Sequence, residues 1–528
     1  MGNNVDYLFV SLIMKVERAN QKDILLVGGN LMKKFFGIFV MTCIFFLGTN
    51  LSILVSAEEK VQEEVIYNVL IDRYNNRNHQ IDQQVDVENP LKYHGGDFEG
   101  IINKLDDLKE LGVTTISLSP IMANADDGYH GYWIEDFYKI EEQFGTMEDF
   151  QLLVEEAHNR NMKIIIEFVT KYVAESHPIV NEAEKDWFTD QEQSGPDWLD
   201  HTASLNLENE EVKSYMMDVA DYWINETDID GYLLHGVDRV PMEFLTELTE
   251  HIQANNPNFY LLGDTLITDE NNQEILENTT LQAIENRSIA TVMSDVFSMP
   301  DNEVSEIYDV WKENESTSSL LYVDDMYTKR FTQKFSENGR NSLTVWKLAL
   351  TYMFTTPGTP MIFQGSEIPM YGGNAHEAQQ LVQFNSGEDE LQEYYQKISS
   401  LRQHFPALEH GDFELVGSSG AMSVFRRSYE GETVFIAINN SSESKEVSLT
   451  DIESGMQLRG YLGDNTVREN QDGVYRLGLA RETAEVYTVG PNTGLNWGFI
   501  SFVGGVFVLF IFAVIYLSRK QKKQEEKV

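Results

Sequence analysis

The sequence predicts an α/β protein with a closed (β/α)8 TIM barrel, a C-terminal antiparallel β-sandwich domain and a single C-terminal transmembrane helix. Short apolar segments of strand length alternate with amphipathic helical segments over about 330 residues, which favours a parallel sheet covered by helices. Beyond Gly411 the pattern changes to short strands and turns, and an uncharged apolar run lies near the end of the chain. The 528 residues, 42% of them hydrophobic, suffice for one large core and a smaller domain.

Seven segments have the length and apolar content of buried barrel strands: 65–71, 114–120, 163–169, 229–234, 259–264, 319–325 and 360–365. The sixth strand has the weakest signal, and we place it near Ile289 to Val296. Helical periods fall between the strands, for example at 100–112, 147–161 and 210–226. In a barrel of this kind the functional side chains lie at the carboxyl ends of the strands.

An apolar run near the start of the chain predicts a signal peptide over residues 32–57. Two lysines follow Met32, and the run ends on the small residues of a cleavage site at Ala57. Residues 1–31 are predicted to be an extension upstream of the true start. A retained, uncleaved N-terminal helix is the alternative. The one cysteine, Cys43, lies in this signal, so we expect no disulfide in the mature chain.

Residues 499–517 are uncharged and long enough to cross a hydrocarbon layer of about 30 Å. The basic tail, 518–528, is expected to lie in the cytoplasm, which places the preceding segments outside the cell. We therefore expect a single-pass cell-membrane protein. Its extracellular part comprises the barrel (58–408), the β domain (409–490) and a linker (491–498).

The chain is strongly acidic, with 85 Asp and Glu against 39 Lys and Arg. Nucleic acids and anionic membrane surfaces would be repelled by this charge, so we expect no nucleic-acid partner. Partners of the bulk domain are expected to be neutral or cationic.

Four long motifs resemble the α-amylase family, glycoside hydrolase family 13. They are YHGGDFEGIINKLDDLKELGVTTISLSP, DGYHGYWIEDFYKIEEQFGTMEDF, LNLENEEVKSYMMDVADYWINETDIDG and TTPGTPMIFQGSEIPM. The resemblance extends over residues 63–490. It implies an enzyme fold that cleaves α-glucosidic bonds by the retaining route, which needs a carboxylate nucleophile and a second carboxyl group as acid.

The family's catalytic positions are altered in this chain. The pattern G-x-R-x-D after the fourth strand reads Gly231 to His235, so His235 stands at the nucleophile position and Leu233 replaces the Arg. Imidazole has a usual pKa of about 6.5 and does not stabilise a developing positive charge. The acid position after the fifth strand is Asp264, one methylene shorter than the family Glu. We therefore expect hydrolysis to be lost.

The third family carboxylate falls on Tyr327 when the segment after the seventh strand is aligned through Arg330 and Phe331. A tyrosine supplies no anion near neutral pH. A shifted alignment that combines Asp264 with Asp324 or Asp325 leaves open an active retaining α-glucosidase or α-amylase.

The resemblance also implies sugar-contacting positions. His130, Tyr132 and Trp133 keep the family residues, whereas Tyr172 replaces a family His. Aromatic faces suit the apolar side of a sugar ring, so a carbohydrate cleft can persist without hydrolysis. Bracing of the loop against the barrel is the alternative role of this motif. Lys171 replaces an Asn that commonly helps to bind calcium, so we predict calcium-independent stability.

Glu167, His235 and Asp264 end the third, fourth and fifth strands, and they have donor types found in metal sites. We nevertheless predict no metal and no cofactor. Lys171 and Arg239 are nearby, no second His is evident, and an ion-paired cluster needs no metal. The expected function is non-hydrolytic: binding of α-glucan or another neutral carbohydrate at the cell surface, or a scaffold for a membrane-protein partner.

Overall fold

The computed structural model describes residues 61–182, 185–190, 195–492 and 497–525. The predicted signal peptide and the N-terminal extension lie outside the described residues.

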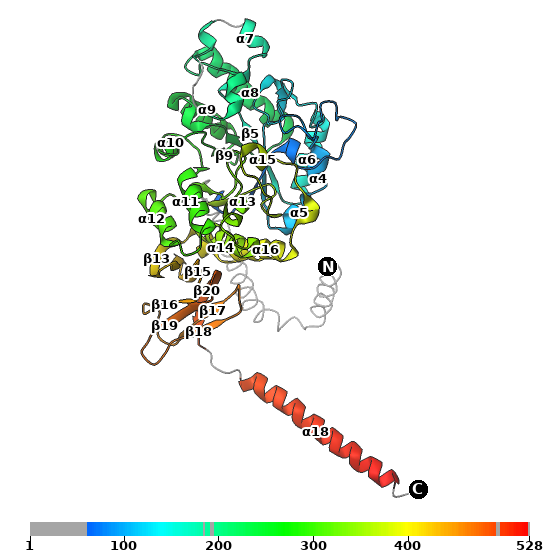
Figure 1. The fold of residues 1–528 in the computed structure, drawn as a ribbon, viewed down its shortest axis with the longest axis vertical. Helices are drawn as coiled ribbons and strands as arrows, with labels where there is room; N and C mark the ends of the chain where they lie inside the picture. Colours follow the sequence, from blue (N-terminus) through cyan, green and yellow to red (C-terminus); the bar gives the residue numbers. More distant parts are fainter. Residues whose placement is uncertain (1–60, 183–184, 191–194, 493–496, 526–528) are drawn as a thin grey trace, which may run out of the picture. The chain divides into compact units, whose positions relative to one another are not determined.

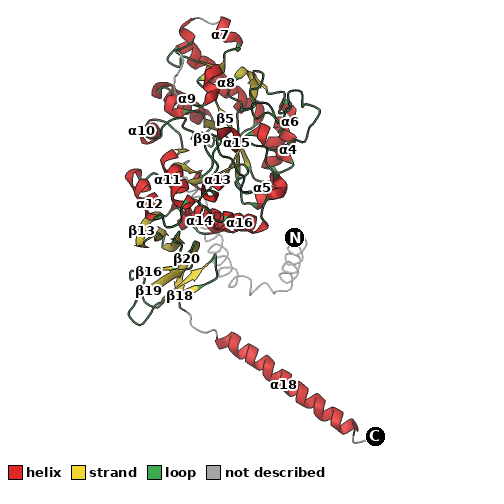
Figure 2. Cartoon of the chain, viewed as in Figure 1, coloured by secondary structure: helices red, strands yellow, loops and turns green. Residues whose placement is uncertain are grey.

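Eight parallel strands close a barrel, which confirms the predicted fold class (Figures 1 and 2). Each strand pairs with its neighbours in chain order, and the last strand pairs with the first. The interior is filled by apolar side chains from alternate strand positions, such as Ile66, Ile165 and Leu233. In chain order the strands are β1 (Ile66–Val69), β2 (Thr115–Leu118), β5 (Lys163–Phe168), β8 (Gly231–Leu234), β9 (Tyr260–Gly263), β10 (Ala283–Glu285), β11 (Ser319–Leu321) and β12 (Thr359–Phe363).

The predicted position of the sixth strand is wrong. The structure places this strand at β10, and residues 289–296 lie within helix α11 (Arg287–Ser298). Asn286 caps that helix by accepting a hydrogen bond from the Ile289 backbone at 2.9 Å. Only three residues form β10, too few to show a strand period in the sequence.

Helices cover the outside of the barrel (Figure 1). Their apolar faces pack on the sheet; in α6, for example, Phe150, Leu153 and Val154 are buried. These helices are α4 (Phe98–Ile102), α5 (Leu105–Glu110), α6 (Met147–His158), α8 (Glu210–Thr227), α9 (Met242–Asn255), α10 (Asn272–Asn278), α11, α12 (Ser305–Asn314), α13 (Phe331–Ser336), α14 (Ser342–Thr355), α16 (Asp389–His404) and α17 (Pro406–His410).

Excursions follow several barrel strands at their carboxyl ends. Two short antiparallel sheets lie there, β3 (Met122–Asn124) with β4 (Ile134–Ile140), and β6 (Tyr172–Ala174) with β7 (Thr202–Ser204). The helical parts of these loops are α7 (Pro178–Glu182), α15 (Ala375–Ala378), η1 (Ile71–Arg73), η2 (Lys185–Trp187), η3 (Asp197–His201), η4 (Val237–Arg239) and η5 (Phe384–Ser386). They supply most of the side chains that surround the mouth of the barrel.

An antiparallel β domain follows the barrel, as predicted. Its larger sheet has the strand order β13-β14-β15-β20-β17-β18, and β16 and β19 form a second sheet of two strands. The strands are β13 (Asp412–Ser419), β14 (Met422–Tyr429), β15 (Glu432–Asn439), β16 (Lys445–Leu449), β17 (Met456–Gly460), β18 (Thr466–Arg468), β19 (Tyr475–Leu479) and β20 (Thr483–Pro491).

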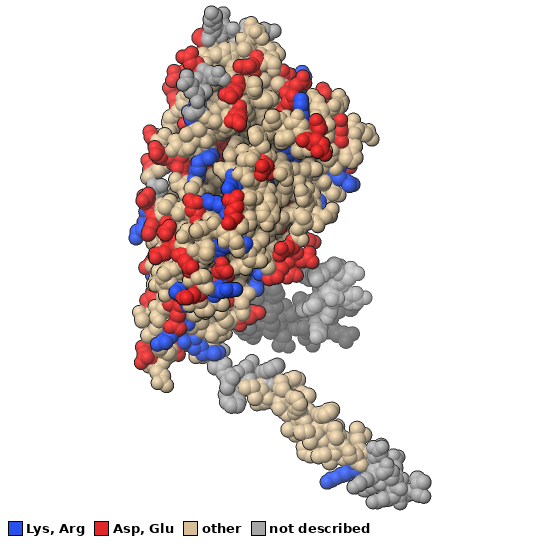
Figure 3. All heavy atoms as spheres, viewed as in Figure 1, with Lys and Arg blue, Asp and Glu red and all other residues tan. Residues whose placement is uncertain are grey.

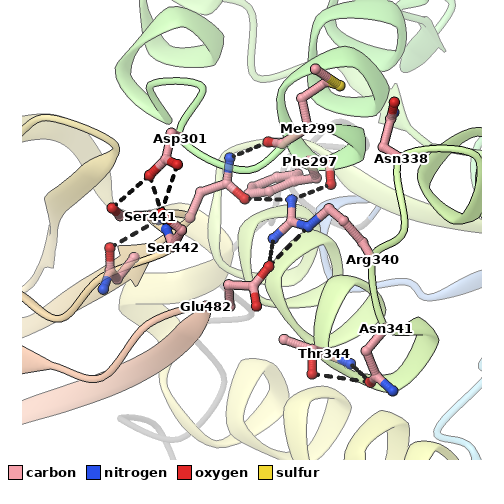
Figure 4. Close-up of polar contacts among 12 residues, drawn as sticks. Phe297, Met299, Asp301, Asn338, Arg340, Asn341, Thr344, Ser441, Ser442 and Glu482 are labelled. Atoms are coloured by element: carbon pink, nitrogen blue, oxygen red, sulfur yellow. Dashed lines mark hydrogen bonds and ion pairs between the residues drawn. The ribbon is translucent and has the colours of Figure 1, made fainter.

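Polar contacts join the barrel to the β domain (Figure 4). Arg340, just before α14, donates to Glu482 at 2.7 and 3.0 Å and to the side-chain oxygen of Asn440 at 2.8 Å. Asp301 accepts hydrogen bonds from the hydroxyls of Ser441 and Ser442 at 2.7 and 2.8 Å. Arg340 is 8% exposed, so removing one partner would leave a charge in a largely dry interface.

A single long helix, α18 (Trp497–Glu525), lies near the end of the chain. Its segment Ile500–Arg519 has a mean hydropathy of 2.7, and its length and composition suit a membrane span. Figure 3 contrasts the mostly uncharged surface of this helix with the many carboxylates spread over the visible face of the barrel.

Candidate functional site

Glu167, His235 and Asp264 meet at the mouth of the barrel. They lie at the carboxyl ends of β5, β8 and β9, three neighbouring strands whose register sets Glu167 beside Leu233 and Leu234 beside Gly263. The Nδ1 atom of His235 lies 2.6 Å from Glu167 Oε1 and 2.8 Å from Asp264 Oδ2. All three side chains are buried. The structure thus places the three residues at the ends of the third, fourth and fifth strands, as expected from the sequence, and brings their side chains into contact.

Neighbouring groups hold both carboxylates in place. Gly236 adopts a left-handed φ of 62°, and its backbone N–H donates to Asp264 Oδ1 at 2.5 Å. The hydroxyl of Tyr132 lies 2.9 Å from one oxygen of Glu167 and 3.2 Å from the other. The same hydroxyl is 2.9 Å from that of Tyr327. Tyr327, which the sequence analysis aligns with the third family carboxylate, thus joins the cluster through Tyr132.

The charges of this cluster are coupled. Burial alone would lower the pKa of His235, but the charges of Asp264 and Glu167 outweigh it and raise this pKa to about 10. Burial raises the pKa of Glu167 to about 7, against the opposing effect of His235. Burial also disfavours ionised Asp264, yet the adjacent imidazolium brings its pKa below the usual value. At neutral pH an imidazolium therefore lies beside an ionised Asp264.

The ligand types of a metal centre are present, but the separations are those of hydrogen bonds. Glu167, His235 and Asp264 are the three residues that could hold an ion together in the described part of the chain. Ligand atoms around a tetrahedral zinc lie about 3.3 Å apart. One nitrogen at 2.6 and 2.8 Å from two carboxylates fits a shared proton, so the residues present form an ion-paired cluster.

Two aromatic rings cover one side of Tyr132. Its centroid lies 4.6 Å from His235 and 4.5 Å from Trp198, with an angle of 24° between planes in both cases. Rings stacked on opposite faces would lie about 9 Å from each other. Trp198 and His235 are only 5.4 Å apart, so both lie on the same side of Tyr132.

A cleft of about 550 Å³ opens at the barrel mouth. Three of the four predicted substrate residues, His130, Tyr132 and Trp133, line it, together with Trp198 and Tyr327. Burial lowers the pKa of His130 to about 3, so this ring is neutral at physiological pH. Tyr172, the fourth, is 1% exposed, lies edge-on to Trp198 at 5.5 Å and does not contribute to the described lining.

The carboxylates of the barrel mouth line a separate, smaller space. A cavity of about 30 Å³ is bordered by five acidic residues: Glu167, Asp264, Glu285, Asp324 and Asp325. None of the five contributes to the described lining of the larger cleft. Tyr132, Met326 and Tyr327 line both spaces. This volume holds a few water molecules at most, so no sugar ring fits beside these carboxylates.

The two alternative carboxylates already have structural contacts. Asp324 accepts hydrogen bonds from the Phe331 backbone at 2.5 Å and the Ser366 hydroxyl at 2.9 Å. Asp325 accepts from the backbones of Tyr327 and Thr328 at 2.8 and 2.7 Å, which fixes the turn after β11. Both line the small cavity rather than the cleft, so the geometry gives neither a position next to a bound sugar.

Several residues of the site were not predicted, and three of them bear on its chemistry: Trp198, Glu285 and Arg287. Trp198 lies in an excursion without a regular period, where the sequence gives no contact information. Glu285 ends the strand that was misplaced, and burial raises its pKa well above the usual value. Arg287 lines the cleft and donates to the backbone oxygen of Thr265 at 2.5 Å. A correct position for the sixth strand would have placed the last two at the barrel mouth.

Lys171 replaces an Asn that commonly helps to bind calcium in the family, and the structure shows what its side chain contacts. Its ammonium donates to the backbone oxygen of Arg239 at 2.7 Å. The Lys171 ammonium therefore occupies a carbonyl oxygen of the kind that calcium ions bind.

A parallel barrel with paired carboxyl groups at its mouth, followed by an antiparallel β domain, defines a class of carbohydrate-active protein. The model of the α-amylase catalytic domain matches residues 68–404, and that of the α-amylase C-terminal domain matches residues 411–487. The chain belongs to the α-amylase family.

Solved structures agree with this assignment. An α-amylase from Anoxybacillus has a TM-score of 0.78 and 42% identity, covering 82% of this chain and 99% of its own. The Geobacillus thermoleovorans α-amylase, solved with acarbose, has a TM-score of 0.76 and 38% identity, with the same coverage of both chains.

Curated relatives are more distant in sequence. A cyclomaltodextrinase from Geobacillus thermopakistaniensis is 28% identical over 436 residues, covering 75% of this chain and 72% of its own length. A β/α-amylase from Paenibacillus polymyxa is 28% identical over 459 residues, which is 81% of this chain but only 38% of that enzyme.

Proposed function

We propose that this chain is a non-hydrolytic member of the α-amylase family that binds α-glucan at the cell surface. One observation supports this proposal most directly: the five acidic residues at the strand ends, from Glu167 to Asp325, line a small separate cavity, and none of these five contributes to the described lining of the cleft. Retaining hydrolysis needs a carboxylate against the anomeric carbon, where this chain has the cationic ring of His235.

The cleft supports carbohydrate binding. It combines the aromatic rings of Tyr129 and Trp133 with polar groups such as Asp127 and Gln379. Rings of this kind stack on the apolar face of a pyranose while the polar groups bond its hydroxyls. Acarbose is bound by the Geobacillus thermoleovorans relative, and a linear α-glucan is the ligand we propose for this chain.

A turnover assay separates this proposal from the enzymatic alternative. The full-length chain in detergent is incubated with maltoheptaose and with 4-nitrophenyl α-glucoside, beside an Asp264→Ala variant. We expect no product from either protein. Turnover by the wild type that Asp264→Ala abolishes would instead establish an enzyme that uses Asp264.

Calorimetric titration with maltoheptaose tests the binding itself. We expect the wild type to bind and Trp133→Ala, in the cleft, to bind at least about tenfold more weakly because a stacking ring is lost. Trp187→Ala is the matched control, because Trp187 lies outside the described lining of the cleft. Absence of binding by the wild type would contradict the proposal, and co-purification of a membrane protein would then favour a scaffold.

We also propose that α18 anchors the protein in the cell membrane with the barrel outside. The length and hydropathy of Ile500–Arg519 support the span, and the lysines that follow Arg519 support a cytoplasmic end. Carbonate extraction of cell membranes should leave the full chain in the pellet, and external protease should digest the barrel on intact cells. Release of the full chain by carbonate would contradict the anchor.

A further inference from the structure

Trp198 lies where a sugar ring would have to bind for any reaction at the barrel mouth. The geometry of retaining cleavage requires the sugar to lie against the residue at the nucleophile position, here His235. The ring of Tyr132 stacks on His235 with 4.6 Å between centroids, so a sugar held against His235 would lie on the side of Tyr132 that faces His235. Trp198 already occupies this side, 4.5 Å from Tyr132 and 5.4 Å from His235.

Packing holds the indole in this position. Tyr172 contacts it edge-on at 5.5 Å, and the backbone oxygen of Trp198 accepts a hydrogen bond from the Trp133 indole at 2.8 Å. The side chain lines the cleft but is only 8% exposed, so most of its surface points inward. Its own Nε1 is buried without a hydrogen-bond partner among the described residues, so aromatic contact is what stabilises this placement.

We infer that Trp198 is a built-in plug that fills the central sugar subsite and thereby sets the depth of the glucan-binding cleft. A glucan then occupies the outer cleft only, and no sugar ring reaches Tyr132 or the buried cluster behind it. This inference rests on the proposed function, since it specifies where the glucan lies. Trp198 is a specificity-determining residue in this scheme and has no part in a chemical step.

Replacing Trp198 by Ala should open the subsite. The space vacated by the indole borders Tyr132 and His235 and is continuous with the cleft, so a sugar ring can stack on Tyr132 there. We expect the full-length Trp198→Ala variant to bind acarbose and maltoheptaose at least about tenfold more tightly than the wild type, as measured by calorimetry. Trp198→Phe keeps an aromatic plug and should remain within about threefold of the wild type.

Melting curves identify variants that have lost their fold. Should Trp198→Ala melt far below the wild type, Trp198→Leu retains apolar volume while removing the wide indole, and it should show a smaller gain in affinity. Affinity that is unchanged or reduced in every folded variant without the ring would overturn the inference.

The pattern of outcomes separates this inference from the proposed function. If the wild type binds and Trp198→Ala binds no more tightly, the inference about Trp198 is wrong and the glucan-binding proposal stands. A variant that binds when the wild type does not establishes the plug and contradicts glucan binding by the natural protein. Absence of binding in the wild type and in every folded variant refutes both.

Discussion

Replacing His235 by Gln removes the positive charge between two buried carboxylates. The pKa of the imidazole is about 10 in the folded protein and about 6.5 in an unfolded chain, so the folded state binds this proton more tightly. The stabilisation that results is fully present below about pH 6.5 and is lost as the pH rises through about 10. The wild type should therefore lose stability between pH 7 and pH 10.5.

The magnitude follows from two independent arguments. The difference between the two pKa values of His235 corresponds to about 5 kcal/mol, as an upper estimate for a buried, coupled group. Breaking a buried ion pair by removing one partner costs about 3–5 kcal/mol. We expect His235→Gln to be less stable than the wild type by about 3–5 kcal/mol at pH 7, and this gap should narrow above pH 10.

Glu167 acts in a different range of pH. Its pKa of about 7 in the fold exceeds the usual 4.5, so it favours the folded state while protonated and its contribution is lost between about pH 4.5 and pH 7. Glu167 of the wild type is almost fully ionised by about pH 8, one unit above its pKa, so the loss of stability from about pH 8 to pH 10.5 reports the titration of His235.

Thermal unfolding of both proteins from pH 6 to pH 10.5 provides the assay. Other groups titrate in this range; burial lowers the pKa of Arg402 to about 10, for example. The difference between wild type and variant cancels their effect. We expect the variant to melt at least about 5 °C lower at pH 7. A gap that stays constant up to pH 10.5, or a variant as stable as the wild type, would refute this account of the cluster.

Two further predictions concern calcium and the domain interface. Addition of EDTA should change the melting temperature by less than about 1 °C, because the Lys171 ammonium already binds the Arg239 carbonyl; a large loss that calcium restores would contradict this. Arg340→Ala should cost about 3–5 kcal/mol in thermal or urea unfolding, because it strands Glu482 and Asn440 at the interface (Figure 4). Asn341→Ala, which removes only the α14 cap, should cost about 1 kcal/mol, and equal costs for the two variants would contradict the buried role of Arg340.

Much of the barrel could be predicted because its strands are buried on both faces. A run such as 163–169 is apolar at five of its seven positions and has the length of a strand, so it stands out from the amphipathic helices around it. The sixth strand did not stand out because β10 is three residues long, while the apolar run after it forms the buried face of α11. A period in the sequence identifies an element from its apolar face and its length, and three residues are too few to show either.

Only the part of the site that lies at the ends of the barrel strands could be predicted from the sequence. Glu167, His235 and Asp264 follow consecutive strands, so their meeting is a consequence of the barrel. The contacts of Tyr132 with Tyr327 and Trp198 depend on loops, whose paths do not follow from a period in the sequence. Three of the four predicted substrate residues therefore line the cleft, whereas Tyr172 is buried behind Trp198.

Two substitutions toward the family pattern test whether activity can be restored while the other differences of the site remain. Leu233→Arg combined with His235→Asp returns the arginine and the nucleophile that the sequence resemblance predicts for the pattern G-x-R-x-D. We expect no hydrolysis of maltoheptaose, because Asp264 is still one methylene short, Tyr327 still supplies no anion and Trp198 still fills the sugar position.

The new Asp would also lie beside the buried carboxyl groups of Glu167 and Asp264, where burial and mutual repulsion favour protonation over the ionised form that a nucleophile requires. Adding Trp198→Ala opens the subsite without correcting these charges, so the triple variant should gain binding before it gains turnover. Full activity of the double variant would contradict this account, because it would show that the barrel mouth can rearrange to ionise the new Asp and to admit a sugar.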